Sequence, residues 1–140
     1  MALKASALKV GDTKKERVVE NLSRTQIVQY AGVSGDYNPL HTDEVYTVQA
    51  AGYPSVFAHG MLTMGLTGKA LTNYVGDGRL TKFGVRFTNQ VWPGDTLDTT
   101  ITVDGLREEN GQKLVDLKLS TTNQDGKEVV SGTATARVDP

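Results

Sequence analysis

An acidic residue and an imidazole lie five positions apart in the segment Tyr30–Asp43, which reads YAGVSGDYNPLHTD. On a straight helix such side chains would diverge by about 140°, because each residue turns the helix by ~100°. The Asn38-Pro39 step between Asp36 and His41 favours a turn instead, and across a turn the two side chains can converge. A carboxylate and an imidazole that share one site can hold a water molecule and transfer its protons. The plainer interpretation is that Asp36 and Asn38 only build the turn and that His41 lies on the surface.

A second polar segment, YPSVFAHGM, runs from Tyr53 to Met61 and leads into an apolar stretch. If a helix begins there, its first amides are unpaired and carry the positive end of the helix dipole. Gly60 has no Cβ, so a ligand oxygen could approach its amide, as in an oxyanion hole. The alternative for Gly60 is close packing of the helix against a sheet, and both can hold. For His59 the sequence favours a structural hydrogen bond at the helix start over contact with a ligand.

The composition excludes several other kinds of chemistry. There is no cysteine, which excludes disulfides, thiolate nucleophiles, iron–sulfur clusters and cysteine zinc sites. The sensible metal ligands are His41, Asp43 and His59, but their spacing matches no known metal motif, and we expect no metal. Neither a P-loop nor a dinucleotide-binding G-x-G-x-x-G motif is present. Fifteen basic residues against 16 acidic ones give a net charge of −1, so nucleic acid is not an expected partner.

Two helices are expected to position these segments within a single domain, residues 1–140, since 140 residues fit one domain. Ser23 is the predicted N-cap of a helix that ends near Gly32 or Ser34. Residues 35–54 are rich in turn formers, with a short helix near 43–51. The second helix, over about 59–74, is apolar nearly all round and should be buried. Gly65 and Gly68 inside it indicate that another backbone approaches closely.

The strands follow a different pattern, in which apolar and polar residues alternate with period two. Turn signals, among them Asn110-Gly111, separate the alternating runs of the last 60 residues. The strands are expected at about 13–22, 82–91, 97–103, 115–120 and 130–138. The fold class is therefore α+β, in which a four-strand antiparallel meander curves around the buried helix.

No membrane association is expected. Residues 45–68 contain no charged side chain other than histidine, but Gly, Pro, Gln and His interrupt the run, so it should be buried within the protein. The N-terminus has no apolar run long enough for a signal-peptide core, and a cytoplasmic location is the expectation.

The segment Tyr30–Asp43 resembles the signature of the MaoC-like, hydratase 2 family of (R)-specific enoyl-CoA hydratases. Two further blocks match that family in order: Ala58-His59-Gly60-Met61, and Val85–Thr88 followed by Val91–Asp95. The resemblance spans about residues 10–138. It extends to (3R)-hydroxyacyl-thioester dehydratases.

This resemblance implies a hot-dog fold, a curved antiparallel sheet wrapped around a central helix and usually dimerised edge to edge. It implies reversible syn hydration of trans-2-enoyl thioesters, carried by CoA or acyl carrier protein, to (3R)-hydroxyacyl thioesters. Asp36 and His41 would be the catalytic acid and imidazole, and the Gly60 amide the oxyanion donor. Neither a metal nor a cofactor is implied, since CoA or phosphopantetheine is part of the substrate. The expected substrate-contacting residues are Asn38, Ser55, Ala58, His59, Met61 and Arg86.

Several alternatives stay open. The chain could be a hot-dog thioesterase, the catalytic subunit of a heteromeric (3R)-hydroxyacyl-carrier-protein dehydratase, or a non-catalytic acyl-binding subunit. It could form a homodimer, a higher homo-oligomer or a heterodimer. Arg86, with Lys82 or Arg79, could meet the phosphates of CoA or could be a solvated charge. Glu44 and Gln90 stand where the family often has proline, which affects loop shape more than proton transfer.

Overall fold

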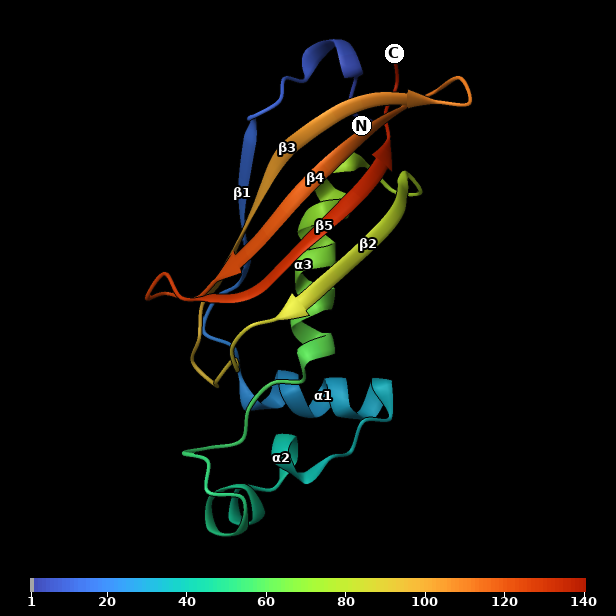
Figure 1. The fold of residues 1–140 in the computed structure, drawn as a ribbon. Helices are drawn as coiled ribbons and strands as arrows, with labels where there is room; N and C mark the ends of the chain where they lie inside the picture. The colour runs from blue at the N-terminus through green and yellow to red at the C-terminus, as the bar shows by residue number, and fades with distance from the viewer. Residues whose placement is uncertain (1) are drawn as a thin grey trace.

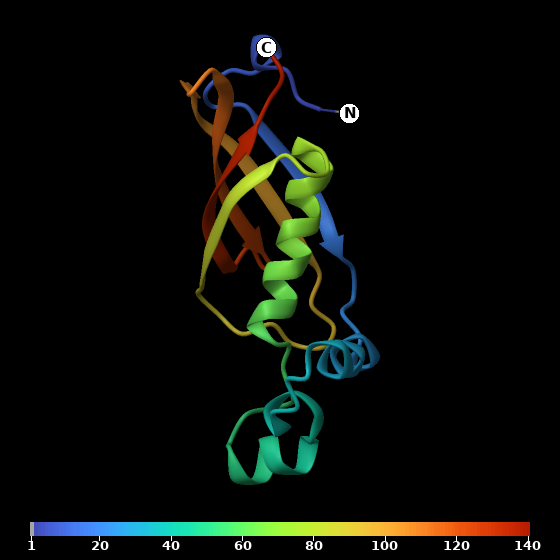
Figure 2. The same cartoon turned by 90° about the vertical axis from the view of Figure 1, so that its right-hand side faces the viewer.

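A five-stranded antiparallel sheet curves around the helix α3 (Gly60–Val75), as Figures 1 and 2 show. The computed structural model describes residues 2–140. The strand order is β1-β3-β4-β5-β2. The strands are β1 (Thr13–Val19), β2 (Leu80–Phe87), β3 (Leu97–Glu109), β4 (Gln112–Thr122) and β5 (Glu128–Arg137). The expected α+β class, with a sheet around a central helix, is confirmed.

The expected order of the strands is wrong in one respect. A simple meander would place β2 beside β3, but β2 pairs with β5 at one edge of the sheet and β1 pairs with β3 at the other. The link between β2 and β3, residues 88–96, is too long for a tight hairpin. Its main chain hydrogen-bonds instead to Leu22 and to Ala58, the latter just before α3 in the chain. It thereby carries the chain from one edge of the sheet to the other side. The strand expected over 82–91 accordingly ends at Phe87, before Asn89 and Val91.

Within the strands, the alternation correctly predicts which side chains are buried. Leu97, Thr99, Ile101 and Val103 of β3 are all buried, with less buried residues between them. The turn between β3 and β4 has positive φ at both Asn110 (51°) and Gly111 (77°), as a type I′ turn requires. The two central strands are therefore held in register by a turn that the sequence specifies.

The core consists of two apolar clusters that share α3. One contains Leu71 and Val75 with the middle of β3, β4 and β5, and the other contains Leu62 with α1 (Arg24–Ser34) and Val91. Three buried threonines lie along the same elements: the Thr121 hydroxyl is 2.7 Å from the hydroxyls of both Thr67 and Thr99. These polar groups satisfy one another, so their burial carries no unpaired hydroxyl.

The glycines of α3 do not act as expected. A Cβ at Gly65 would meet nothing within 4 Å, so no close approach explains this residue. A Cβ at Gly68 would lie 3.2 Å from the ring of Phe83, which is a side chain and not the predicted backbone. Close contact at this helix is therefore made by an aromatic ring of β2.

Residues 24–57 extend beyond one end of the sheet and are called the overhang below (Figures 1 and 2). The overhang holds α1, α2 (Pro39–Thr42) and a π-helical turn, Tyr46–Ala50. Ser23 caps α1, as predicted, by accepting a 3.0 Å hydrogen bond from the Gln26 amide. The expected burial of residues 45–68 is wrong for much of its overhang part, because Val45 is 64% exposed, although Thr47 and Val56 are buried.

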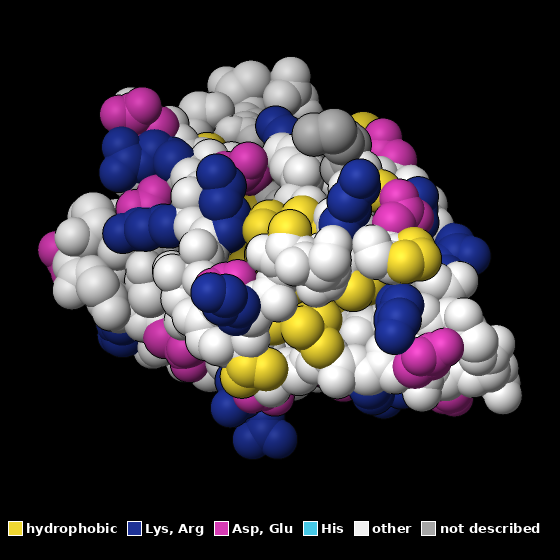
Figure 3. All heavy atoms as spheres, turned by 90° about the horizontal axis from the view of Figure 1, so that it is seen from above, with side chains coloured by type: hydrophobic (Ala, Val, Ile, Leu, Met, Phe, Trp, Pro, Cys, Tyr) yellow, Lys and Arg dark blue, Asp and Glu magenta, His cyan; other side chains and the backbone are white. Residues whose placement is uncertain are grey.

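The opposite end of the molecule mixes positive and negative side chains around small apolar areas (Figure 3). No histidine is visible on that face, since both lie toward the overhang. Within residues 2–140 we find no helix long and apolar enough to span a bilayer.

Candidate active site

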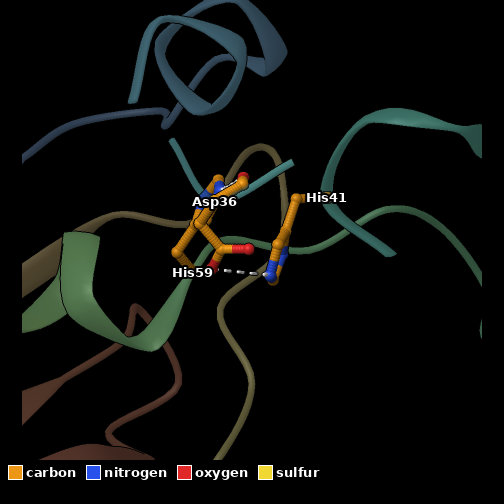
Figure 4. Close-up of side chains that lie close together, drawn as sticks. All are labelled: Asp36, His41 and His59. Carbon is orange, nitrogen blue, oxygen red and sulfur yellow. Dashed lines mark hydrogen bonds and ion pairs between the residues drawn. The ribbon is translucent and has the colours of Figure 1, made fainter. Parts of the chain in front are cut away.

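The turn after α1 is built by the polar side chains that the sequence places there. Helix α1 ends at Gly35, whose φ of 76° is left-handed and favours glycine. The Asp36 carboxylate accepts a 3.3 Å hydrogen bond from the Asn38 amide. Asn38 in turn caps α2 by accepting a 3.0 Å bond from the Leu40 amide, with Pro39 at the first helical position. This chain of local bonds brings His41 back toward Asp36, as Figure 4 shows.

Asp36 and His41 converge in a defined geometry. The Nδ1–H of His41 donates a 2.7 Å hydrogen bond to the Phe57 carbonyl, because a carbonyl can only accept. In the neutral ring, Nε2 therefore carries the free lone pair, and it lies 4.0 Å from Asp36 Oδ2 (Figure 4). The side chain of His41 is only 11% exposed, whereas that of Asp36 is 53% exposed. The surface interpretation of His41 is therefore wrong.

The gap between these two atoms is suited to a small oxygen-containing molecule. At 4.0 Å the Asp36 and His41 atoms are too far apart for a direct hydrogen bond. One water oxygen can lie about 2.8 Å from both atoms at once, which is an ordinary hydrogen-bond length. The arrangement can hold a water between an acceptor carboxylate and a basic nitrogen.

His59 is a buried residue in contact with both members of this pair. It is 1% exposed, its ring stacks on that of His41 with centroids 3.8 Å apart, and it contacts the Tyr30 ring edge-on. Its Nε2–H donates a 3.0 Å bond to the Asp36 main-chain carbonyl. The pKa of His59 is lowered from its ordinary value. Burial is the largest cause, and the nearby His41 lowers the pKa further. His59 is thus a neutral, buried support and not a surface group.

Gly60 is the first residue of α3, and its neighbour His59 makes no side-chain cap. The Gly60 amide therefore has no partner within the helix. A pocket of about 320 Å³ lies beside it. The lining residues are Phe57, Ala58, Gly60, Thr63, Phe87, Thr88, Asn89, Gln90, Val91 and Val129. Asp36 and His41 do not line this pocket, but Phe57, which does, holds His41 through its carbonyl.

Comparison with known proteins places this geometry in a family. Residues 6–125 match the family described as MaoC like domain. The chain belongs to the MaoC-like family. It is 35% identical over 123 residues to the (R)-specific enoyl-CoA hydratase of Rhodospirillum rubrum, which covers 86% of this chain and 83% of that protein. It is 44% identical over 72 residues, 49% of this chain and 25% of the relative, to 3-hydroxyacyl-thioester dehydratase Y of Mycobacterium tuberculosis.

Solved structures agree with the expected hot-dog fold. The unliganded R-hydratase PhaJ1 of Pseudomonas aeruginosa superposes with a TM-score of 0.86 at 28% identity, covering 99% of this chain and 86% of that one. The chain nevertheless spans a third or less of the length of several curated relatives that it matches. A MaoC-like domain can thus be one part of a longer protein.

The other predicted contact residues divide by location. Ala58 lines the pocket, while Met61 is 56% exposed at the start of α3. The Ser55 hydroxyl accepts a 3.2 Å bond from Arg24, which also pairs with Glu44, the residue in place of the family's proline. Arg86 lies apart from the catalytic pair within this chain, in a shallow outer hollow with Lys118 and Ser131. Its proposed contact with substrate phosphates stays a prediction.

Three supporting residues escaped the sequence analysis. Phe57 acts through its carbonyl, which leaves no trace in residue type, and Tyr30 acts through its ring edge. Asp95 ends one of the blocks that match the family, but no role was predicted for it; it is buried and accepts bonds from the Trp92 amide and the Gln124 side chain. The Trp-Pro-Gly-Asp block carried the signal, because a buried carboxylate in a turn needs such partners.

The titratable cluster here does not fit a metal ion. Asp36, His41 and His59 offer ligand atoms within 4.8 Å of one another, whereas Asp43, which the sequence offered as a conceivable ligand, instead accepts a bond from the Tyr46 amide. An imidazole binds a metal through a lone pair in its ring plane, about 2 Å away. The planes of His41 and His59 are stacked, with only 25° between them, so their lone pairs do not meet at one point.

Proposed function

We propose that this chain catalyses the reversible syn addition of water to trans-2-enoyl thioesters, which yields (3R)-hydroxyacyl thioesters. The observation that carries this proposal is the 4.0 Å gap between Asp36 Oδ2 and His41 Nε2, beside the free Gly60 amide and a partly apolar pocket. The (R)-specific hydratase among the relatives, matched over most of both chains, supports the same reaction and stereochemistry. The thioester would be carried by CoA or by the phosphopantetheine of a carrier protein.

His41 acts as the base that activates water. Its Nδ1–H is held by the Phe57 carbonyl, so Nε2 takes a proton from the water while the Asp36 carboxylate orients that water and stabilises the imidazolium. The water oxygen bonds to C3, and the C2–C3 π electrons move to the thioester carbonyl. The imidazolium then returns the proton to C2. One water is added, and His41 ends neutral.

The Gly60 amide is assigned to the charge that develops on the thioester oxygen. An unpaired amide at the positive end of α3 stabilises an enolate-like oxygen more than a neutral carbonyl. Since the acid–base pair and this amide supply all the steps, the proposed reaction needs no metal and no organic cofactor. Elimination of water uses the same groups in reverse.

The direct test is hydration of crotonyl-CoA by the purified chain. It is followed by the loss of absorbance of the conjugated enoyl thioester, with chiral analysis of the product. Asp36→Asn and His41→Gln should each abolish turnover while the protein stays folded, because each removes one side of the water site. Asp43→Asn is the matched control, since Asp43 only caps the turn at Tyr46 and asparagine can accept the same bond. Near-normal turnover in either site variant would contradict the assigned roles. Release of free thiol with the double bond intact would instead indicate a thioesterase.

We also propose that the chain works as a dimer or higher oligomer, in the cytoplasm. The outer edge of β2 has no neighbouring strand among residues 2–140, and Val33 and Tyr37, close to Asp36 in the chain, are 88% and 68% exposed. Exposed edges and apolar clusters favour association with another chain. Sedimentation of the purified chain, with activity measured on the same sample, separates a working homo-oligomer from a subunit that needs a different hot-dog partner.

A further inference from the structure

One buried residue contacts all three parts of the proposed site. His59 precedes the Gly60 amide in the chain, stacks on the His41 ring and bonds to the Asp36 main chain. We propose that His59 is a positioning residue that fixes Asp36, His41 and Gly60 relative to one another. This inference rests on the proposed hydratase function, but its structural part can be tested separately.

The hydrogen bond to Asp36 defines the state of His59. A carbonyl oxygen can only accept, so the proton of the neutral ring is on Nε2. Nδ1 is then a buried acceptor, and no partner reaches it among residues 2–140. Such an unpaired atom costs stability. A phenylalanine would fill a similar volume without that cost, so packing alone does not account for a histidine here.

The bond from His59 is the hydrogen bond that joins residues 35–38 directly to the start of α3, while Leu40 and His41, which follow, bond to Phe57. The other hydrogen bonds recorded for residues 35–38 stay within the segment 31–41. The Asp36 side chain is more than half exposed, so little packing restrains it. Without the donor on His59, the main chain at Asp36 would be held only indirectly, through the bonds of Leu40 and His41 to Phe57, and the carboxylate would lose part of its alignment with His41.

The stacked ring supplies the second constraint. The His41 ring stacks on the His59 ring, with centroids 3.8 Å apart, and makes a T-shaped contact with the Phe57 ring, with centroids 5.4 Å apart. The titratable groups that face His59 are Asp36, His41 and Tyr30. A neutral His59 can support the imidazolium that forms on His41 during turnover, whereas a charged one would repel it.

Two substitutions separate the donor from the bulk of the side chain. His59→Phe keeps a ring for stacking and loses the donor, and it should lower kcat for crotonyl-CoA about 10- to 100-fold with KM changed less than about threefold, as expected for misalignment. His59→Gln keeps an N–H donor near the position of Nε2 and should recover most of that loss. A His59→Phe enzyme with normal kcat, or a His59→Gln enzyme as slow as His59→Phe, would overturn the proposal.

Control measurements distinguish positioning from loss of fold. Val115→Ala, in the core cluster that contains Leu71 and Val75, should lower the unfolding temperature while kcat stays normal. Nitrogen-15 NMR of the wild-type chain should show His59 protonated on Nε2 alone at neutral pH, and backbone relaxation should show residues 35–38 more mobile in His59→Phe. A proton on Nδ1, or an unchanged turn, would refute the positioning role even if the wild type proved inactive as a hydratase. Inactivity with both NMR results as expected would refute the function and keep the structural assignment.

Discussion

The two histidines of this chain have opposite surroundings, although the sequence places them in similar polar segments. His41 gives one nitrogen to the Phe57 carbonyl and keeps the other facing Asp36 across a gap. His59 donates from one nitrogen to the Asp36 carbonyl, and its other nitrogen is buried with no partner among residues 2–140. One ring can therefore exchange a proton with a bound water, while the other is suited to remain neutral and hold its neighbours.

The buried His59 should make stability depend on pH. Its pKa in the folded chain is lowered from the ordinary value of 6.5, mainly by burial. As pH falls below about 6.5 the unfolded chain takes up a proton that the folded chain does not, so the free energy of unfolding decreases until the lowered pKa is passed. His59→Phe removes this contribution. Urea unfolding at pH 7 and pH 5.5 should show a smaller loss of stability for His59→Phe, and equal losses would contradict the cause assigned to the lowered pKa.

Gly60 also allows a test of the close contact between the start of α3 and the Phe87 ring. A Cβ there would lie 3.0 Å from the Phe87 ring, which is half exposed and able to move. Gly60→Ala should lower stability by about 1 kcal/mol or more from overpacking, and should lower kcat as the helix start shifts. Adding Phe87→Leu relieves the contact and should restore part of both losses. If the double variant is no better than Gly60→Ala in both assays, the contact is not the cause.

At the residue scale, the sequence predicted those parts of the site that depend on side-chain type. Asp36, His41 and Gly60 could be named as candidates because a carboxylate, an imidazole and a missing Cβ each have a specific chemistry, and their catalytic roles stay predictions. The Phe57 carbonyl could not be found, since every residue carries one. Arg86 was predicted beside the substrate, but within this chain its strand directs it to the outer hollow.

At the scale of elements, local patterns identified helices and strands but not their partners. The Ser23 cap, the α3 helix and the Asn110-Gly111 turn follow from neighbouring residues, and all were predicted. The position of β2 depends on residues 88–96, whose bonds go to Leu22 and Ala58, distant in sequence. Period-two alternation is the same whichever strand lies alongside, so it could not reveal that β2 pairs with β5.

The loop before β3 is an element whose stability can be tested through Asp95. This buried carboxylate accepts bonds from the Trp92 amide and the Gln124 side chain. Asp95→Ala leaves both donors unpaired and should cost about 1–3 kcal/mol of unfolding free energy, measured in urea. Hydratase activity should fall as well, because Val91 of this loop accepts the Ala58 amide next to the active site. Asp125→Ala, at an exposed turn, is the control and should change neither quantity.

At the scale of the whole molecule, the chain divides into a sheet-covered body and the overhang. The strands β3 and β4 pair along their whole length, while the overhang carries several exposed apolar residues and has no sheet of its own. Hydrogen exchange in the isolated chain should therefore be faster in the overhang than in β3 and β4, because its amides open locally without global unfolding. Mass spectrometry of the exchanged protein measures this directly, and equal protection in both parts would contradict it. Association with a second chain should slow exchange at Val33 and Tyr37 first if the exposed residues form the contact.

The residues at both ends of the overhang hydrogen-bond to the same short loop, residues 91–95. Leu22, where the chain leaves the body, bonds to Gly94 and Asp95, and Ala58, where it returns, bonds to Val91. The turn that carries Asp36 and His41 thus belongs to a segment whose two ends are both held by the loop at residues 91–95. Recombination between members of the family at Leu22 and Ala58 would transfer Asp36 and His41 together. Chimeras that take this segment and the loop at 91–95 from the same parent should keep Asp36 and His41 aligned. Chimeras that take the segment and the loop from different parents should lose that alignment.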